Sequence, residues 1–171
     1  MNRLELQRKL NEKAVWNTTE LTVILGKNRS IAKVYADRLK KAGILRPLAR
    51  GWYASSPNIF AIATSIKNNS YFSFLSALQL HHALDQMPFK VQVVAAKKGP
   101  DMQGVEWVVF PPDKIFGYER IRVDGYSANL ATLEKAVADI AYRPRLASLN
   151  YAYAAITRCD MQKLAEYARM M

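Results

Sequence analysis

The chain has 171 residues, of which 25 are Lys or Arg and 14 are Asp or Glu, so its formal net charge is +11. Half of the residues are hydrophobic, which is enough to build a core and excludes a chain whose main state is disordered. A single cysteine, Cys159, excludes a disulfide scaffold and fits a reducing compartment. No apolar run is long enough to span a bilayer, and the first residues lack the apolar core of a secretory signal. We therefore expect a cytoplasmic protein with no membrane partner.

The positive charge is concentrated in the first third of the chain. Residues 1–56 contain 12 basic and 4 acidic residues, a net +8, whereas residues 57–171 contain 13 and 10, a net +3. Such asymmetry favours a nucleic acid or an anionic membrane as partner of the first third. A basic surface that serves only solubility explains it equally well. The segment Ser55-Ser56-Pro57 is the natural boundary between two domains, 1–56 and 57–171.

The first domain begins with two predicted helices. Apolar residues recur every four positions over 3–14, which predicts an amphipathic helix. Asn17 and Glu20 have the spacing of a capping box and open a second helix, which ends at Gly26. A short polar turn over 27–30 should follow.

A third helix is predicted over 31–42, ended by Gly43. Its expected buried stripe consists of Ile31, Tyr35, Leu39 and Ala42. Strands over 44–46 and 52–54 then predict a hairpin with its tip at Arg50-Gly51. Pro47 has no N–H and therefore belongs at an edge or in the loop.

The order helix, helix, turn, basic helix and hairpin is that of a winged helix-turn-helix. In this fold one helix enters the DNA major groove and the hairpin lies along the backbone or the adjacent minor groove. The expected DNA-binding residues are Lys27, Asn28, Arg29, Ser30, Lys33, Asp37, Lys40, Lys41, Arg46 and Arg50. Those in the first half of the third helix should reach bases, followed by Ala36 and Asp37, while Lys40 and Lys41 are better placed for phosphates.

The basic segment is also compatible with roles that do not involve DNA. A solvated helix face accounts for any one of the charges equally well, and some winged modules bind proteins. Trp52 and Tyr53 are expected to anchor the hairpin to the helical core, with stacking on a sugar or base as the alternative.

The second domain predicts a mixture of helices with a small, mainly antiparallel sheet, so the whole chain is expected to be α+β. Helices are predicted over 59–66 and 74–84, and strands over 91–95 and 105–109. Asp124-Gly125 is a strong hairpin signal. Further predictions are a helix from a Thr132 cap to Tyr142, and one or two closing helices interrupted near Asp160.

Four segments of the chain follow the order of motifs of one family. They are Gly43-Ile44-Leu45 with Arg50-Gly51-Trp52-Tyr53, then Tyr71-Phe72-Ser73-Phe74-Leu75-Ser76-Ala77-Leu78 with His81 and Asp85-Gln86-Met87-Pro88, then Phe116-Gly117-Tyr118-Glu119 with Asp124-Gly125, and finally Ala131-Thr132-Leu133-Glu134-Lys135-Ala136-Val137-Ala138-Asp139. In these segments the chain resembles the AbiEi-type antitoxins, the antitoxin and regulator halves of type IV abortive-infection toxin–antitoxin systems. His82 departs from the pattern, because the family usually has Gly at that position.

The resemblance implies an N-terminal domain that binds its own operator in double-stranded DNA and represses its operon. It also implies a C-terminal domain that counters a nucleotidyltransferase-like toxin without forming a stable complex with it. Solitary regulators occur in the same family, so a C-terminal domain that dimerises or senses a ligand stays open. A homodimer and an RNA-binding module stay open as well.

The residues give weak support to catalysis or metal binding, and we expect no catalytic residue, metal or cofactor. His81 and His82 are adjacent and would point about 100° apart on a helix. Glu134 and Asp139 are five residues apart, so they do not face each other; Glu134 favours the helix N-terminus, and Asp139 is expected to tether a neighbouring strand or loop. A nucleic-acid enzyme that uses Glu106 or Asp139 is the least favoured alternative.

Overall fold

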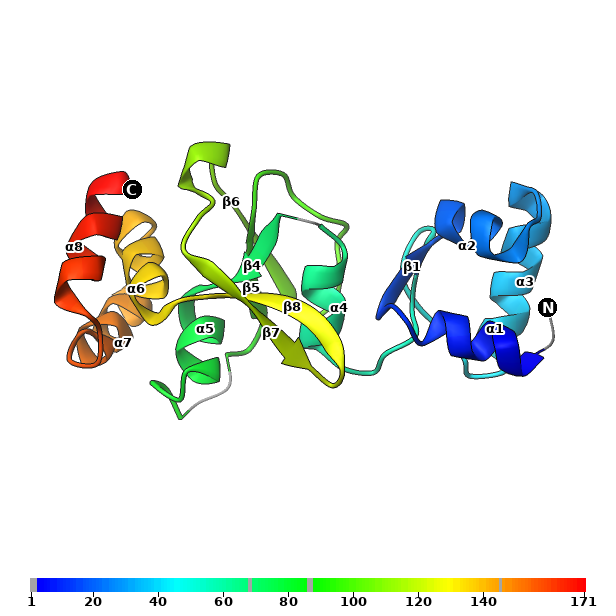
Figure 1. Ribbon diagram of the computed structural model, residues 1–171, viewed down its shortest axis with the longest axis horizontal. Coiled ribbons are helices and arrows are strands. Elements are labelled where there is room, and N and C mark those ends of the chain that lie inside the picture. The colour runs from blue at the N-terminus through cyan, green and yellow to red at the C-terminus, as the bar shows by residue number, and fades with distance from the viewer. Residues whose placement is uncertain (1–2, 68, 86–87, 145) are drawn as a thin grey trace.

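The computed structural model describes residues 3–67, 69–85, 88–144 and 146–171. It is α+β, as predicted, with a three-stranded antiparallel sheet near the N-terminus and a five-stranded mixed sheet further on. In Figure 1 the helices α1–α3 lie at one end of the long axis and α6–α8 at the other, with the larger sheet between them. Two hydrophobic clusters match this arrangement, one among α1–α3 and one that fills the rest.

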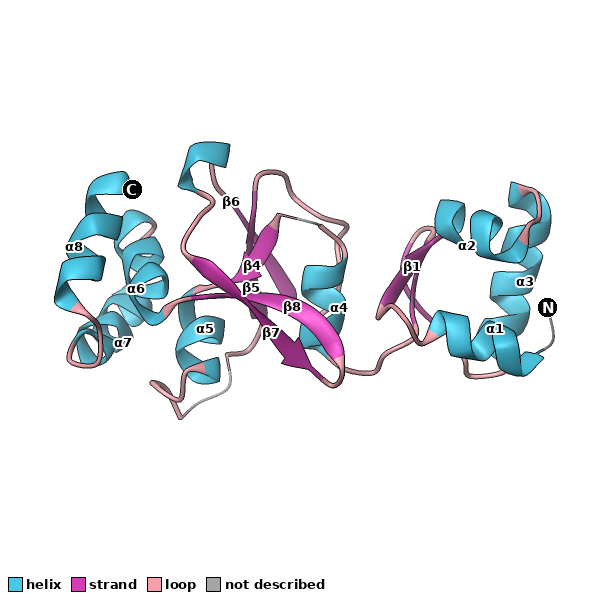
Figure 2. Ribbon diagram, in the orientation of Figure 1, coloured by secondary structure: helices cyan, strands magenta, loops and turns pink. Residues whose placement is uncertain are grey.

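The elements of the first part are α1 (Arg3–Leu10), β1 (Val15–Asn17), α2 (Thr18–Leu25), α3 (Arg29–Lys41), β2 (Arg46–Ala49) and β3 (Trp52–Ala54). Those of the second part are α4 (Ile59–Ser65), β4 (Ser70–Phe72), α5 (Phe74–Leu80), β5 (Val91–Ala95), β6 (Val105–Val109), a 3₁₀ turn (Pro112–Lys114), β7 (Tyr118–Val123), β8 (Tyr126–Ala131), α6 (Leu133–Tyr142), α7 (Leu146–Ile156) and α8 (Met161–Met170). Figure 2 distinguishes the helices from the strands.

The first helix is shorter than predicted, because the chain turns after Leu10 and enters β1. The Trp16 indole Nε1 donates to the Leu10 carbonyl at 2.9 Å, which satisfies one of the open carbonyls at the helix end. Ala14 is fully buried, but in the larger cluster rather than in the one that contains Leu10. Its four-residue spacing therefore reflects burial and not a continuing helix.

The capping box of α2 is confirmed. The Asn17 side chain accepts from the Glu20 N–H, and the Glu20 carboxylate accepts from the Asn17 N–H, each at 2.9 Å. Gly26 ends the helix with a φ of 59°, a left-handed conformation that suits glycine.

Of the four residues predicted to form the buried stripe of α3, only Leu39 is buried. Ala32, Ala36 and Leu39 are buried, whereas Ile31 is 40% exposed. Small alanines let α3 pack closely against α2, so side-chain size misleads about which face is inside. The helix also begins at Arg29, earlier than predicted.

The hairpin forms as β2 and β3, and β1 completes the sheet in the order β1-β3-β2. Pro47 lies in the edge strand β2, as its missing N–H requires. Tyr53 packs against the cluster of α1–α3, whereas Trp52 packs against the larger one. Only Tyr53 therefore has the anchoring role expected of both.

The larger sheet has the strand order β6-β5-β4-β8-β7 and is not mainly antiparallel. The pairs β5·β6 and β4·β8 are parallel, and β4·β5 and β7·β8 are antiparallel. The central strand β4 was not predicted, because Ser70, Tyr71 and Phe72 are all fully buried and show no alternation. Asn68, shortly before β4, lies outside the described residues, as do Gln86 and Met87 of the second resembling segment.

Other local predictions for the second part are confirmed. Asp124 and Gly125 have φ values of 50° and 83° and connect β7 to β8, as a tight hairpin turn requires. Thr132 caps α6, and Asp160 caps α8 by accepting from two backbone N–H groups. Helix α5 ends four residues early, because His82 adopts a left-handed φ of 55° just after its C-cap.

Candidate nucleic-acid interface

All ten residues predicted to contact DNA are exposed. Lys27 and Asn28 precede α3, and Arg46 and Arg50 belong to β2 and the turn after it. The other six lie on α3, which stands at the end of the molecule remote from the C-terminal helices (Figure 1). Exposure on one helix and an adjoining hairpin is the arrangement that a groove-binding surface needs.

The outward face of α3 follows from its buried face. Ser30, Val34, Asp37 and Lys41 are spaced by four, three and four residues and run opposite the buried Ala32, Ala36 and Leu39. Lys33 adjoins this outward row. Ala36 is fully buried, so its expected contact with DNA is wrong. Val34, which is 51% exposed, occupies the outward position instead.

Asn28, which the sequence predicted only as a DNA-binding residue, also has a local structural role. Its Oδ1 accepts from the Ile31 N–H at 3.0 Å, so it is the N-cap of α3. The expected polar turn is therefore partly helical, and the first helical turn carries Arg29 and Ser30.

Most of the basic side chains of α3 keep their charge available. Lys40 forms an ion pair with Asp37 at 3.1 Å, and both side chains are largely exposed. Among the described residues no ion pair involves Arg29, Lys33 or Lys41. These three cations are thus available to a polyanion without breaking an existing contact.

The hairpin tip is held against the start of α2. Thr18 donates to the Gly51 carbonyl from its N–H at 2.9 Å and from its Oγ1 at 3.2 Å. Gly51 has a φ of 78°, which favours glycine, and Arg50 precedes it in the turn. Arg46 at the base of the hairpin donates to the Pro57 carbonyl at 3.5 Å. Arg50 is therefore presented by a fixed turn, while Arg46 leans toward the segment that follows β3.

Sequence reasoning missed two side chains of this surface, Val34 and Arg38. The Arg38 guanidinium lies 5.6 Å from the centre of the Tyr35 ring. The spacing of Ala32, Ala36 and Leu39 could have indicated this, because a buried stripe at these positions leaves Val34 on the opposite, exposed side of the helix.

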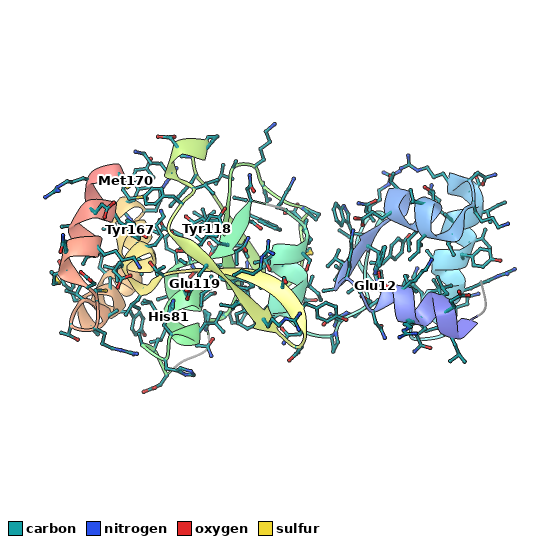
Figure 3. The ribbon with its side chains drawn as sticks, viewed as in Figure 1. Glu12, His81, Tyr118, Glu119, Tyr167 and Met170 are labelled. Carbon is teal, nitrogen blue, oxygen red and sulfur yellow. The ribbon has the colours of Figure 1, made fainter. Side chains whose placement is uncertain are left out.

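The carboxylates considered for catalysis do not come together. Glu106 on β6 accepts from Gln92 Nε2 at 2.9 Å, and Asp139 on α6 is fully buried. His81, which is labelled in Figure 3, has its Nε2 atom 2.7 Å from the Ala131 carbonyl oxygen. Within the described ranges, no group of three or more His, Cys, Asp or Glu residues is placed to hold a metal ion.

Asp139 tethers β4, as the sequence predicted, through a closed polar network. It accepts from Ser73 Oγ at 2.6 Å and from Tyr71 OH at 3.1 Å, and it forms a fully buried ion pair with Lys135. Burial raises the pKa of Asp139 and lowers that of Lys135, while their mutual attraction opposes both shifts. The Lys135 ammonium also donates to the Lys114 carbonyl at 3.1 Å and lies 4.3 Å from the centre of the Phe116 ring. The network therefore joins α6 to β4 and to the turn before β7.

None of the helices in the described part of the chain has the length and apolarity needed to cross a membrane. No protein-family model matches the chain, and a search of curated proteins found no match.

Proposed function

We propose that this protein is a transcriptional regulator that binds duplex DNA through a winged helix-turn-helix formed by residues 1–56. The observation that carries the proposal is the exposure of three cations of α3 that no ion pair among the described residues neutralises: Arg29 at the start of the helix, and Lys33 and Lys41 beside or on its outward row. An α-helix fits the major groove, where each base pair presents a distinct pattern of donors and acceptors.

The exposed residues of α3 and of the hairpin turn suit different parts of the DNA surface. Arg29 can make paired hydrogen bonds to guanine, and the Val34 methyls suit the thymine methyl. Asp37 can accept from the cytosine amino group. Lys41, near the end of α3, and Arg50, in the hairpin turn, are better placed for phosphates.

The first experiment is a footprint and a binding titration on the upstream region of the protein's own gene, over a series of salt concentrations. Five phosphate contacts would lower the affinity about 500-fold between 50 and 200 mM salt, because each contact releases counterions. The double variant Arg29→Ala, Lys33→Ala should lose at least about 30-fold in preference for the operator over unrelated DNA.

A matched control removes one Arg and one Lys from exposed positions in the second part of the chain. Lys97→Ala with Arg120→Ala lowers the net charge by the same amount and should leave the footprint unchanged. Equal losses in both double variants would mean that net charge alone attracts the DNA, and would refute the assignment to α3. Tighter binding to structured RNA than to the duplex would instead favour an RNA-binding module.

Lys40 and Lys41 provide a finer comparison on the same helix. Lys41→Ala should reduce the slope of log affinity against log salt by about 0.9, the value of one phosphate contact. Lys40→Ala should reduce it less, because Lys40 already pairs with Asp37.

We further propose that the regulator is the autorepressing antitoxin of a type IV toxin–antitoxin operon. The support is the resemblance of the four ordered segments within residues 43–139 to AbiEi-type antitoxins. A nucleotidyltransferase-like gene directly downstream, whose toxicity this chain suppresses on co-expression without stable co-purification, is the expected result. A gene that stands alone would favour a solitary regulator.

A further inference from the structure

The two edge strands of the larger sheet differ in how strongly their side chains discourage pairing with another strand. The edge strand β7 carries Glu119, Arg120 and Arg122, all exposed. Charged side chains of this kind discourage contact between edges. The other edge strand, β6, has the sequence Val-Glu-Trp-Val-Val, and Val109 at its end is 44% exposed. It therefore presents a largely apolar edge with a single charged residue.

The backbone of β6 has hydrogen-bonding groups that point away from the sheet. β5 and β6 are parallel, and the Phe110 N–H donates to the Ala95 carbonyl. In a parallel ladder alternate residues bond one neighbour, so the even-numbered residues of β6 bond β5. The N–H and C=O groups of Trp107 and Val109 consequently face outward, and no bond between them and the described residues occurs in the structure. Such groups are a template for another strand.

We propose that β6 pairs antiparallel with β6 of a second copy of this chain, about a two-fold axis at Trp107. This register uses the whole strand. Trp107 then exchanges hydrogen bonds with Trp107 of the second copy, and the Val109 N–H meets the outward carbonyl of Val105. Residues directly opposite each other project from the same face of the sheet. Val105 therefore pairs with Val109 of the second copy, and Trp107 pairs with Trp107, and both are favourable cross-strand pairs. Such a two-fold contact closes at two copies.

Charge complementarity supports this register. Glu106 and Val108 lie on the face of the sheet that carries Gln92, because Gln92 Nε2 donates to Glu106. Val108, Gln92 and the exposed Arg143 line one hollow of about 470 Å³ beside β6. Pairing about Trp107 puts Glu106 of the second copy opposite Val108, and so beside Arg143. The two-fold axis gives the same attraction between Arg143 of the second copy and Glu106 of the first, and no like charges lie opposite each other in the paired strands. Dimerisation through β6 involves the larger sheet alone and does not require DNA binding.

The test is sedimentation velocity of the full chain without DNA, from 1 to about 300 µM. We expect a monomer–dimer equilibrium with a dissociation constant in the micromolar range, because a contact between short strands lies at the small end of specific interfaces. Val109→Lys should weaken dimerisation at least about tenfold, since it places a charge against Val105 of the second copy. Val23→Lys is the matched control, because Val23 is 78% exposed on α2, away from β6, and should leave dimerisation unchanged.

The register is tested separately by charge. Arg143→Glu should weaken dimerisation about tenfold by bringing two carboxylates together. Adding Glu106→Gln should restore the level of Glu106→Gln alone, because Gln can still accept from Gln92 but carries no charge. Circular dichroism of each variant confirms that it is folded. A chain that stays monomeric at 300 µM, oligomers beyond a dimer, equal effects of Val109→Lys and Val23→Lys, or no rescue by Glu106→Gln would each overturn the proposal.

Discussion

Replacing Asp139 by Asn should lower the free energy of unfolding by about 3–5 kcal/mol, because the change leaves the Lys135 ammonium buried without its counter-charge. Neither side chain of the pair has any exposed surface. The new amide keeps one oxygen that can accept from Ser73 and Tyr71, but its NH₂ group is a second donor facing the lysine. Backbone and ring contacts of Lys135 replace only part of the lost attraction.

The reciprocal variant separates the pair from its surroundings. Lys135→Met should lower stability by a similar amount, because Asp139 is then the uncompensated charge. The double variant Lys135→Met, Asp139→Asn should lose less than the sum of the single losses, and the difference is the coupling energy of the pair. Lys163→Met is the matched control. Lys163 is 39% exposed and lies 3.4 Å from Glu134, so its loss should stay below about 1 kcal/mol.

Urea unfolding at neutral pH, followed by near-UV circular dichroism, measures these differences. An Asp139→Asn variant within 1 kcal/mol of the wild type, or strictly additive single losses, would refute the view that burial makes this pair indispensable.

Three further predictions concern single residues. Gly99→Ala should destabilise the protein by about 1–3 kcal/mol and alter tryptophan fluorescence, because an added Cβ would lie 2.3 Å from the Trp107 ring; an unchanged unfolding midpoint would contradict this. Burial acts to raise the pKa of Glu134, but hydrogen bonds from backbone N–H groups outweigh it and hold that pKa below its usual value. Glu134 therefore stabilises the fold above about pH 4.5, and this contribution is lost as the pH falls through its lowered pKa. Glu134→Gln should reduce the acid dependence of unfolding below about pH 4.5, and an identical pH profile would exclude this role. His82→Gly should raise stability by up to about 1 kcal/mol in thermal unfolding, because His82 has a φ of 55°, and a clear loss would show that its side chain matters more than its backbone strain.

Local signals in the sequence predicted local structure well. The Asn17 and Glu20 spacing, the Asp124-Gly125 turn and the Thr132 cap each act over a few residues, so their chemistry is independent of the rest of the chain. The same holds for the exposure of the predicted DNA-binding residues, since charged side chains rarely lose water without a partner.

Two predictions about strands failed because they depend on partners distant in the sequence. The strand β4 has no alternation, because both of its faces are covered by elements that come earlier and later in the chain. The mainly antiparallel sheet was wrong for a similar reason. The parallel pairing of β4 with β8 joins segments almost sixty residues apart, and nothing in either segment specifies the direction of its neighbour.

The sequence by itself determined the basic character of the first third, the caps and turns, and the α+β class, because charge and backbone preference belong to each residue. Only the tertiary structure decided which face of α3 is outside. Close packing selected Ala32, Ala36 and Leu39 for the interior and left Val34 and Lys41 at the surface. The structure alone also joined Lys135, Asp139 and Tyr71 in one buried network, since the attraction between their side chains exists only after β4 and α6 have been brought together.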